Sequence, residues 1–60
     1  MNIQLLNRRE VCYLLDIHPS TLWRLIKQGK FPSPLHVGAQ LRRWERSAVE
    51  AALEQLRRAS

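Results

Sequence analysis

Residues 18–34, HPSTLWRLIKQGKFPSP, contain a start signal and a stop signal for a short helix, and this helix is the strongest indication of the fold class. Pro19 suits the first helical turn, where its missing N–H would have no partner. Gly29 suits the position just past the helix, where a left-handed backbone is needed. The sequence therefore predicts a helix over about residues 19–28. Its apolar residues follow the i, i+3, i+4 spacing of one buried face; they are Leu22, Leu25 and Ile26.

The opposite face of this helix is polar and cationic and carries no carboxylate. A helix with an apolar back and a cationic front suits the major groove of DNA. The candidate DNA-binding residues of the helix are Ser20, Thr21, Arg24, Lys27 and Gln28, with Trp23 at the flank.

The candidates on this helix differ in the contact that is expected of each side chain. Arg24 lies opposite the apolar face, so its planar guanidinium is expected to reach a guanine or a phosphate. Lys27 is a point charge on a flexible stem and is expected to contact phosphate. In the first turn, the hydroxyls and free backbone N–H groups of Ser20 and Thr21 either hold a phosphate or cap the helix. For Trp23, packing beside the core is favoured over contact with DNA.

A second helix, which precedes the first one in the chain, is predicted over about residues 8–15. Asn7 is a good N-cap, and Glu10 three residues later completes a variant of the capping box. The segment 16–18 then turns the chain, since Asp16 tolerates the left-handed conformation of a tight turn. Two helices joined by such a short turn form a helix-turn-helix.

Beyond Gly29 the sequence predicts a hairpin and then a last helix. Two prolines in the segment 30–34 force an extended connection. A β-hairpin is expected over about residues 35–44 and a helix over about residues 46–58. The apolar stripe of the last helix consists of Val49, Ala52, Leu53 and Leu56.

Four arginines outside the 19–28 helix are further candidates for phosphate contact. Arg8 and Arg9 open the first helix, where their charge opposes the helix dipole. They are therefore placed either for phosphates or for solvent alone. Arg42 and Arg43 alternate along a strand, so only one of them is expected on the outer face, and Arg42 is preferred.

Length, charge and cysteine content narrow the class of protein. Sixty residues make at most one domain, residues 1–60, with a small core. The net charge of +5 and the pI of about 10.8 favour polyanionic partners, although many small domains are basic for solubility. The chain shows no signal peptide, and no segment is long and apolar enough to span a bilayer. A cytoplasmic protein without membrane contact is expected.

Metal binding and catalysis are not expected. Cys12, His18 and His36 lack the paired spacing of zinc ligands. A domain of this size has little room for a catalytic pocket. The single cysteine cannot form an internal disulfide and is interpreted as a small buried hydrophobe. The sequence thus indicates neither an enzyme nor a cofactor.

The order of these segments resembles a known group of regulators. The matching pieces are STLWRLI at 20–26, GKFPSP at 29–34 and WERSAV at 44–49. Together they resemble the AlpA-type phage and prophage regulators and are similar to excisionases of the same MerR-like winged-helix group. The resemblance runs from about Leu5 to Leu56.

The resemblance implies a winged helix-turn-helix, mainly α with a small β-hairpin. The 19–28 helix would enter the major groove, and the 35–44 hairpin would be the wing along the backbone or the minor groove. Members regulate transcription in mobile elements, act as recombination directionality factors, or do both. The chain departs from the pattern at His18, where the family often has Ser, at Gln40, where the wing often carries Arg, and at Asp16 in the first turn.

The partner expected from these features is double-stranded DNA. Further copies on adjacent sites are expected too, because a single domain reads only a short site. An integrase or RNA polymerase is an additional candidate partner. The alternative is a protein–protein interaction module that docks through the last helix, and the burial of its apolar stripe in the free protein distinguishes the two.

Overall fold

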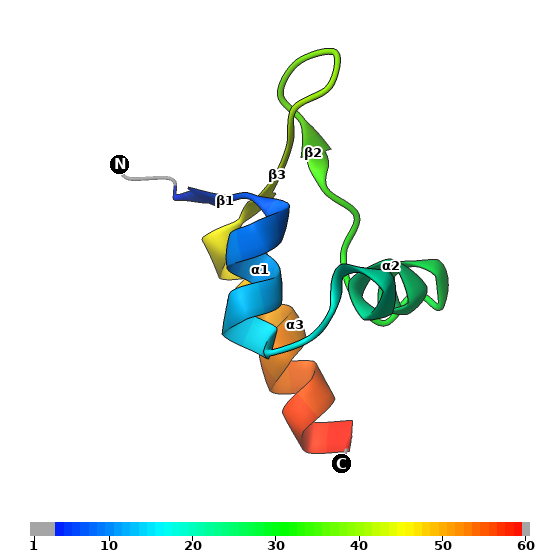
Figure 1. Ribbon diagram of the computed structural model, residues 1–60. Helices are drawn as coiled ribbons and strands as arrows, with labels where there is room; N and C mark the ends of the chain where they lie inside the picture. Colours follow the sequence, from blue (N-terminus) through cyan, green and yellow to red (C-terminus); the bar gives the residue numbers. More distant parts are fainter. Residues whose placement is uncertain (1–3, 60) are drawn as a thin grey trace.

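The computed structural model describes residues 4–59, which form three helices and three short strands (Figure 1). α2 lies to one side of α1, and the β2–β3 hairpin projects away from the helices. The predicted class, mainly helical with a small antiparallel hairpin, is confirmed. In chain order the elements are β1 (Leu5–Leu6), α1 (Arg8–Leu15), α2 (Pro19–Lys27), β2 (Leu35–His36), β3 (Arg42–Glu45) and α3 (Arg46–Ala59).

α1 is short, and local sequence caps it at both ends. The Asn7 side chain accepts a hydrogen bond from the Glu10 N–H (2.8 Å), and the Glu10 carboxylate accepts one from the Asn7 N–H (2.8 Å). This is the predicted capping box. At the other end Asp16 adopts the left-handed conformation, with φ of 55°, and its N–H donates to the carbonyls of Cys12 and Tyr13. The chain therefore turns sharply toward α2.

α2 begins at Pro19, as predicted, and ends at Lys27, one residue before the expected end, with Gln28 as its C-cap. The N-cap is His18, whose side chain accepts a hydrogen bond from the Ser20 N–H. Gly29 follows with φ of 73°, the left-handed conformation that glycine adopts without strain. Phe31 then returns into the core at 4% exposure, and the chain to the wing is extended.

The wing is the antiparallel pair of β2 and β3, in which Leu35 lies opposite Arg43 and His36 opposite Arg42. A third strand, which the sequence did not predict, pairs with the other edge of β3. Leu6 of β1 lies opposite Trp44, so the sheet order is β1-β3-β2. Two adjacent apolar residues show no alternation that would predict a strand. Leu5 and Leu6 form a strand only because they pair with β3.

The core is small and takes residues from all three helices and from β1 and β3. Trp44 is 1% exposed, and its Nε1 donates to the Pro32 carbonyl at 2.9 Å, which joins the wing to the extended segment after α2. Cys12 is buried, as predicted. This core fixes α1, α2 and the wing relative to one another. Its buried members are Leu6, Val11, Cys12, Leu22, Phe31, Trp44 and Val49.

Candidate nucleic-acid interface

The outward face of α2 presents three of the predicted candidates in a row. Ser20, Arg24 and Lys27 are spaced i, i+4, i+7 and are all exposed. Together with Trp23 and Ile26 they line a shallow, open hollow of about 590 Å³. The structure therefore brings a hydroxyl, a guanidinium and an ammonium group to one side of the helix. Such a row is long enough to meet base edges and the adjoining phosphates.

The first turn of α2 differs from the expectation for Ser20 and Thr21. The Ser20 N–H donates to the His18 Nδ1 (3.1 Å), and the N–H groups of Thr21 and Leu22 donate to the His18 carbonyl (2.9 and 3.1 Å). Because Pro19 has no N–H, no backbone donor of this turn is left for an anion. The expectation of free N–H groups there was wrong. Of the two hydroxyls, that of Ser20 lies 2.9 Å from the His18 Nδ1, and Thr21 is half-buried.

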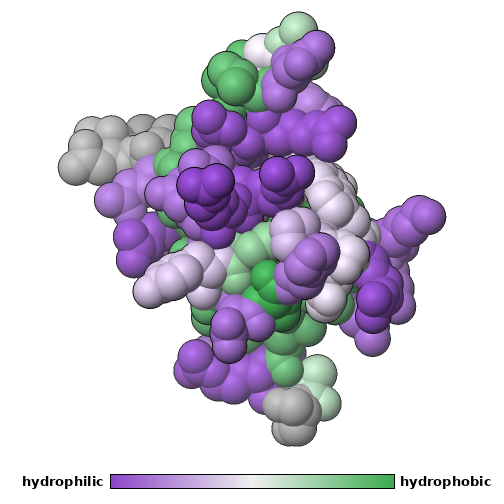
Figure 2. All heavy atoms as spheres, viewed as in Figure 1, coloured by the Kyte–Doolittle hydropathy of each residue, from purple (hydrophilic) through white to green (hydrophobic). Residues whose placement is uncertain are grey.

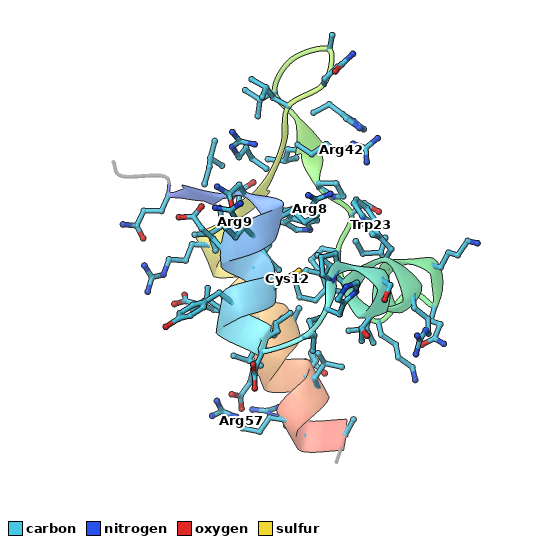
Figure 3. All side chains as sticks on the ribbon, viewed as in Figure 1. Arg8, Arg9, Cys12, Trp23, Arg42 and Arg57 are labelled. Carbon is cyan, nitrogen blue, oxygen red and sulfur yellow. The ribbon has the colours of Figure 1, made fainter. Side chains whose placement is uncertain are left out.

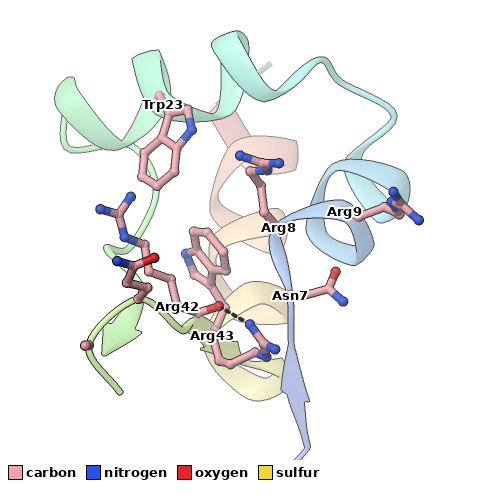
Figure 4. A pocket seen from close by; sticks show the side chains of 9 residues that line it. Asn7, Arg8, Arg9, Trp23, Arg42 and Arg43 are labelled. Carbon is pink, nitrogen blue, oxygen red and sulfur yellow. Dashed lines mark hydrogen bonds between the residues drawn. The ribbon is translucent and has the colours of Figure 1, made fainter. Parts of the chain in front are cut away.

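A second, larger hollow of about 720 Å³ opens between the first turn of α1, α2 and the wing (Figure 4). Arg8 and Arg42 point toward Trp23 from two sides, while Arg9 lies at the margin. Four arginines and no carboxylate line this hollow, which makes it a strongly cationic surface. The lining residues are Asn7, Arg8, Arg9, Trp23, Ala39, Gln40, Arg42, Arg43 and Trp44.

Both wing arginines take part in this hollow. Arg42 is exposed, and its Cζ lies 5.5 Å from the centroid of the Trp23 ring, within cation–π range. Arg43 is half-buried and folds back, so that its Nη1 donates to the Arg42 carbonyl at 2.8 Å. Because side chains alternate along a strand, Arg42 was predicted to be the outer of the two, and it is the more exposed one. The alternation does not predict that the long Arg43 side chain reaches the same hollow as its neighbour.

Trp23 joins the two hollows, because it lines both. Its ring is half-buried, with its centroid 6.1 Å from that of Trp44 at an interplanar angle of 50°. The ring therefore packs against the core, the role that sequence reasoning favoured. Its outer surface still faces the interface beneath Arg42, so packing and ligand contact are compatible at this position.

The charges of the molecule are unevenly distributed. Three ion pairs lie on α3, where Arg46 meets Glu50 (3.4 Å), and Glu54 meets Arg57 (3.8 Å) and Arg58 (3.3 Å). The remaining cations make no ion pair with any residue in the range 4–59. All but Lys30 lie on α2, in the first turn of α1 or on β3. These cations are Arg8, Arg9, Arg24, Lys27, Lys30, Arg42 and Arg43.

This asymmetry is visible on the surface. Hydrophilic side chains gather over the start of α1 and the base of the wing (Figure 2). The labelled arginines Arg8 and Arg42 cluster near Trp23, whereas Arg57 lies far away near the end of α3 (Figure 3). Cations without carboxylate partners attract a polyanion and repel one another when no polyanion is bound. The face formed by α2, the α1 start and the wing is therefore the candidate interface.

Two predicted residues line neither hollow, and several residues outside the prediction line the larger one. Thr21 and Gln28 line neither hollow, and Gln28 serves instead as the C-cap of α2. Asn7 and Gln40 line the larger hollow, although Asn7 was considered only as a cap. Neither carries a charge that would single it out in the sequence. Their place depends on how α1 meets the wing.

Other kinds of site find no geometric support in residues 4–59. No three His, Cys, Asp or Glu side chains of this range come together as metal ligands would. Within the same residues, no helix has the length and apolarity needed to cross a membrane.

Comparison with known proteins gives a single finding. A family model described as a helix-turn-helix domain matches residues 5–57, a range that takes in both hollows, all three helices up to the last turn of α3, and the wing. No curated protein and no solved structure matches the chain.

Proposed function

Since the chain belongs to the helix-turn-helix domain family, we propose that it is a sequence-specific DNA-binding protein that acts without catalysis. The observation that carries this proposal is the continuity of the two hollows through Trp23. One hollow lies on the outward face of α2 and the other leads from α2 to the wing. A duplex that receives a helix in its major groove presents its phosphate backbone on either side of that helix.

Each part of the face has a role in this proposal. Arg24 reads a base edge or a phosphate in the major groove, and Lys27 holds a phosphate. Arg42 in the wing and Arg8 and Arg9 at the start of α1 hold the backbone that runs past the larger hollow. Thr21 and Gln28 remain candidates at the two ends of α2.

The finer assignment is to the AlpA-type regulators and the related excisionases. We propose that the protein regulates transcription in a phage or another mobile element, directs recombination as an excisionase, or does both. The support is the resemblance in the segments 20–26, 29–34 and 44–49. Several copies on adjacent sites, and an integrase or RNA polymerase, are the proposed partners.

Selection of bound duplexes from a random pool, followed by a gel assay for bending, tests this assignment. Direct repeats with strong bending indicate the recombination role, since such a factor must deform DNA. A single, unbent site near a promoter indicates the regulatory role. A pool without enrichment of any sequence contradicts the proposed function.

Docking of a protein on α3 is the second candidate function. Val49 is 2% exposed and Ala52 packs on the core, so the first half of the stripe is already used within the domain. Leu53 and Leu56 are only half-buried. Beside them an apolar hollow of about 490 Å³ opens between the end of α3 and the segment after α2. If Leu56→Glu abolishes function in cells while DNA affinity in solution is unchanged, this second role is supported.

A further inference from the structure

The cap of α2 is unusual because a histidine, rather than a small hydroxyl or carboxyl residue, accepts the first free N–H. The His18 Nδ1 lies 3.1 Å from the Ser20 N and 2.9 Å from the Ser20 Oγ. Among residues 4–59 the His18 ring has hydrogen bonds to Ser20 alone. Both residues are exposed, and Ser20 belongs to the outward row of α2.

The backbone contact decides which ring nitrogen carries the proton. A backbone N–H can only donate, so the Nδ1 that faces the Ser20 N–H must offer a lone pair. A neutral imidazole carries one proton, which is then on Nε2. The opposite tautomer would set two N–H groups against each other and leave Ser20 without its cap.

The same atom then fixes the Ser20 hydroxyl. With Nδ1 unprotonated, the 2.9 Å contact requires the hydroxyl to donate its only hydrogen, so the single lone pair of Nδ1 is shared between the N–H and the O–H of Ser20. What remains on the Ser20 Oγ is acceptor capacity alone. The side chain of Ser20 thus has a defined hydrogen-bonding direction, although a serine hydroxyl ordinarily rotates to donate or accept as its partner requires.

We propose that His18 is a positioning residue for DNA specificity, which acts by making Ser20 an obligate hydrogen-bond acceptor on the outward face of α2. The inference rests on the proposed function, because it concerns the same face. An acceptor in the major groove is met by the exocyclic amino group of adenine (N6) or cytosine (N4). It is not met by guanine O6 and N7, by thymine O4 or by a phosphate oxygen, which are all acceptors. Ser20 therefore reads a base that offers an amino group and does not hold a phosphate.

The tautomer is measured directly in the free protein. The ¹⁵N shifts of the His18 ring in its neutral form are expected to show an unprotonated Nδ1 and a protonated Nε2. A ring protonated at Nδ1 contradicts the proposal whether or not the protein binds DNA.

The base preference is measured by selecting duplexes from a random pool with the wild type and four variants. Ser20→Ala removes the reading atom, and the base preference at one position of the site is expected to fall by about three- to tenfold, the worth of one hydrogen bond. His18→Gly keeps an acceptable cap residue but frees the hydroxyl, so guanine and thymine are expected to be accepted at that position. His18→Asn restores an acceptor for both Ser20 groups and is expected to restore the preference. His36→Asn, at the exposed histidine of β2, is the matched control and is expected to change nothing there.

The outcomes separate the two proposals. If the wild type enriches no sequence, the proposed function fails. If the wild type enriches a site, and His18→Gly keeps the same preference at the position that Ser20→Ala alters, only the role of His18 fails. Circular dichroism verifies that each variant keeps its helix content. A His18→Asn variant that folds but does not recover the preference also contradicts the proposal.

Discussion

At the scale of single residues, Arg24 stands in the middle of the exposed row of α2, between Ser20 and Lys27. No described residue forms an ion pair with it. Arg24→Ala is therefore expected to leave the fold intact and to weaken binding to the selected site by about 1–3 kcal/mol, with relaxed preference at one base pair. A mobility-shift titration measures this change.

Arg58→Ala is the matched control for Arg24. Arg58 is also an exposed helical arginine, but it pairs with Glu54 on α3, away from the candidate interface. Its removal is expected to change affinity only slightly, through the net charge. Equal losses in the two variants would mean that α2 is not the recognition helix.

Arg42 tests the larger hollow. Its guanidinium lies over the Trp23 ring at 5.5 Å, which holds it at the edge of the hollow. If it neutralises a phosphate, Arg42→Ala reduces by about one unit the slope of log affinity against log salt, because fewer counterions are released. Arg42→Lys keeps the charge and is expected to keep the slope. Affinities measured over a salt series decide between this and a merely solvated arginine, which would leave the slope unchanged in both variants.

Among the connections between elements, the two glycines differ in backbone conformation, since only Gly29 has a positive φ. Gly29 has φ of 73°, and an added Cβ would have no atom within 4 Å. Any cost of Gly29→Ala is therefore backbone strain, about 1–2 kcal/mol. For a domain of this size that lowers the melting temperature by roughly 4–16 °C, at about 4–8 °C per kcal/mol.

Gly38→Ala in the wing is the control, since its Cβ would meet only the Leu41 Cδ1 at an ordinary 3.9 Å. It is expected to leave the melting temperature nearly unchanged or to raise it slightly. Thermal unfolding followed by circular dichroism compares the two variants. A Gly29→Ala variant as stable as the Gly38→Ala variant would contradict the strained left-handed turn.

The elements that could be predicted are those whose signals are local. The capping box of Asn7 and Glu10, the left-handed Asp16 and Pro19 at the start of α2 each depend on residues within one turn. β1 could not be predicted, because its two leucines become a strand only by pairing with Trp44 and Glu45 far along the chain.

The same distinction applies to the interface. Helical spacing alone placed Ser20, Arg24 and Lys27 on one exposed face. The larger hollow requires α1 and the wing to meet, so Asn7 and Gln40 could not be found from spacing. The capping role of His18 could not be predicted, since its bond to the Ser20 N–H depends on a side-chain rotamer.

The size of the whole domain limits the length of DNA that one copy can contact. Its longest dimension is 34 Å. At 3.4 Å per base pair, one copy covers about ten base pairs, close to one turn of the duplex. Hydroxyl-radical footprints are expected to protect about that length at low protein concentration and to lengthen in steps as further copies bind. Protection over several turns at the lowest effective concentration would indicate an oligomer that assembles before it meets DNA.

From the pairing of β1 with β3 we expect a definite order in which the domain folds. Local helical turns form within about a microsecond. β1 can dock only after the chain has closed a loop that brings together Gln4 and Arg46, which are 42 residues apart, and closure of a long loop is entropically costly. Docking of the N-terminal strand is therefore expected late, after the transition state. Leu6→Ala should then accelerate unfolding in stopped-flow experiments and leave the refolding rate almost unchanged.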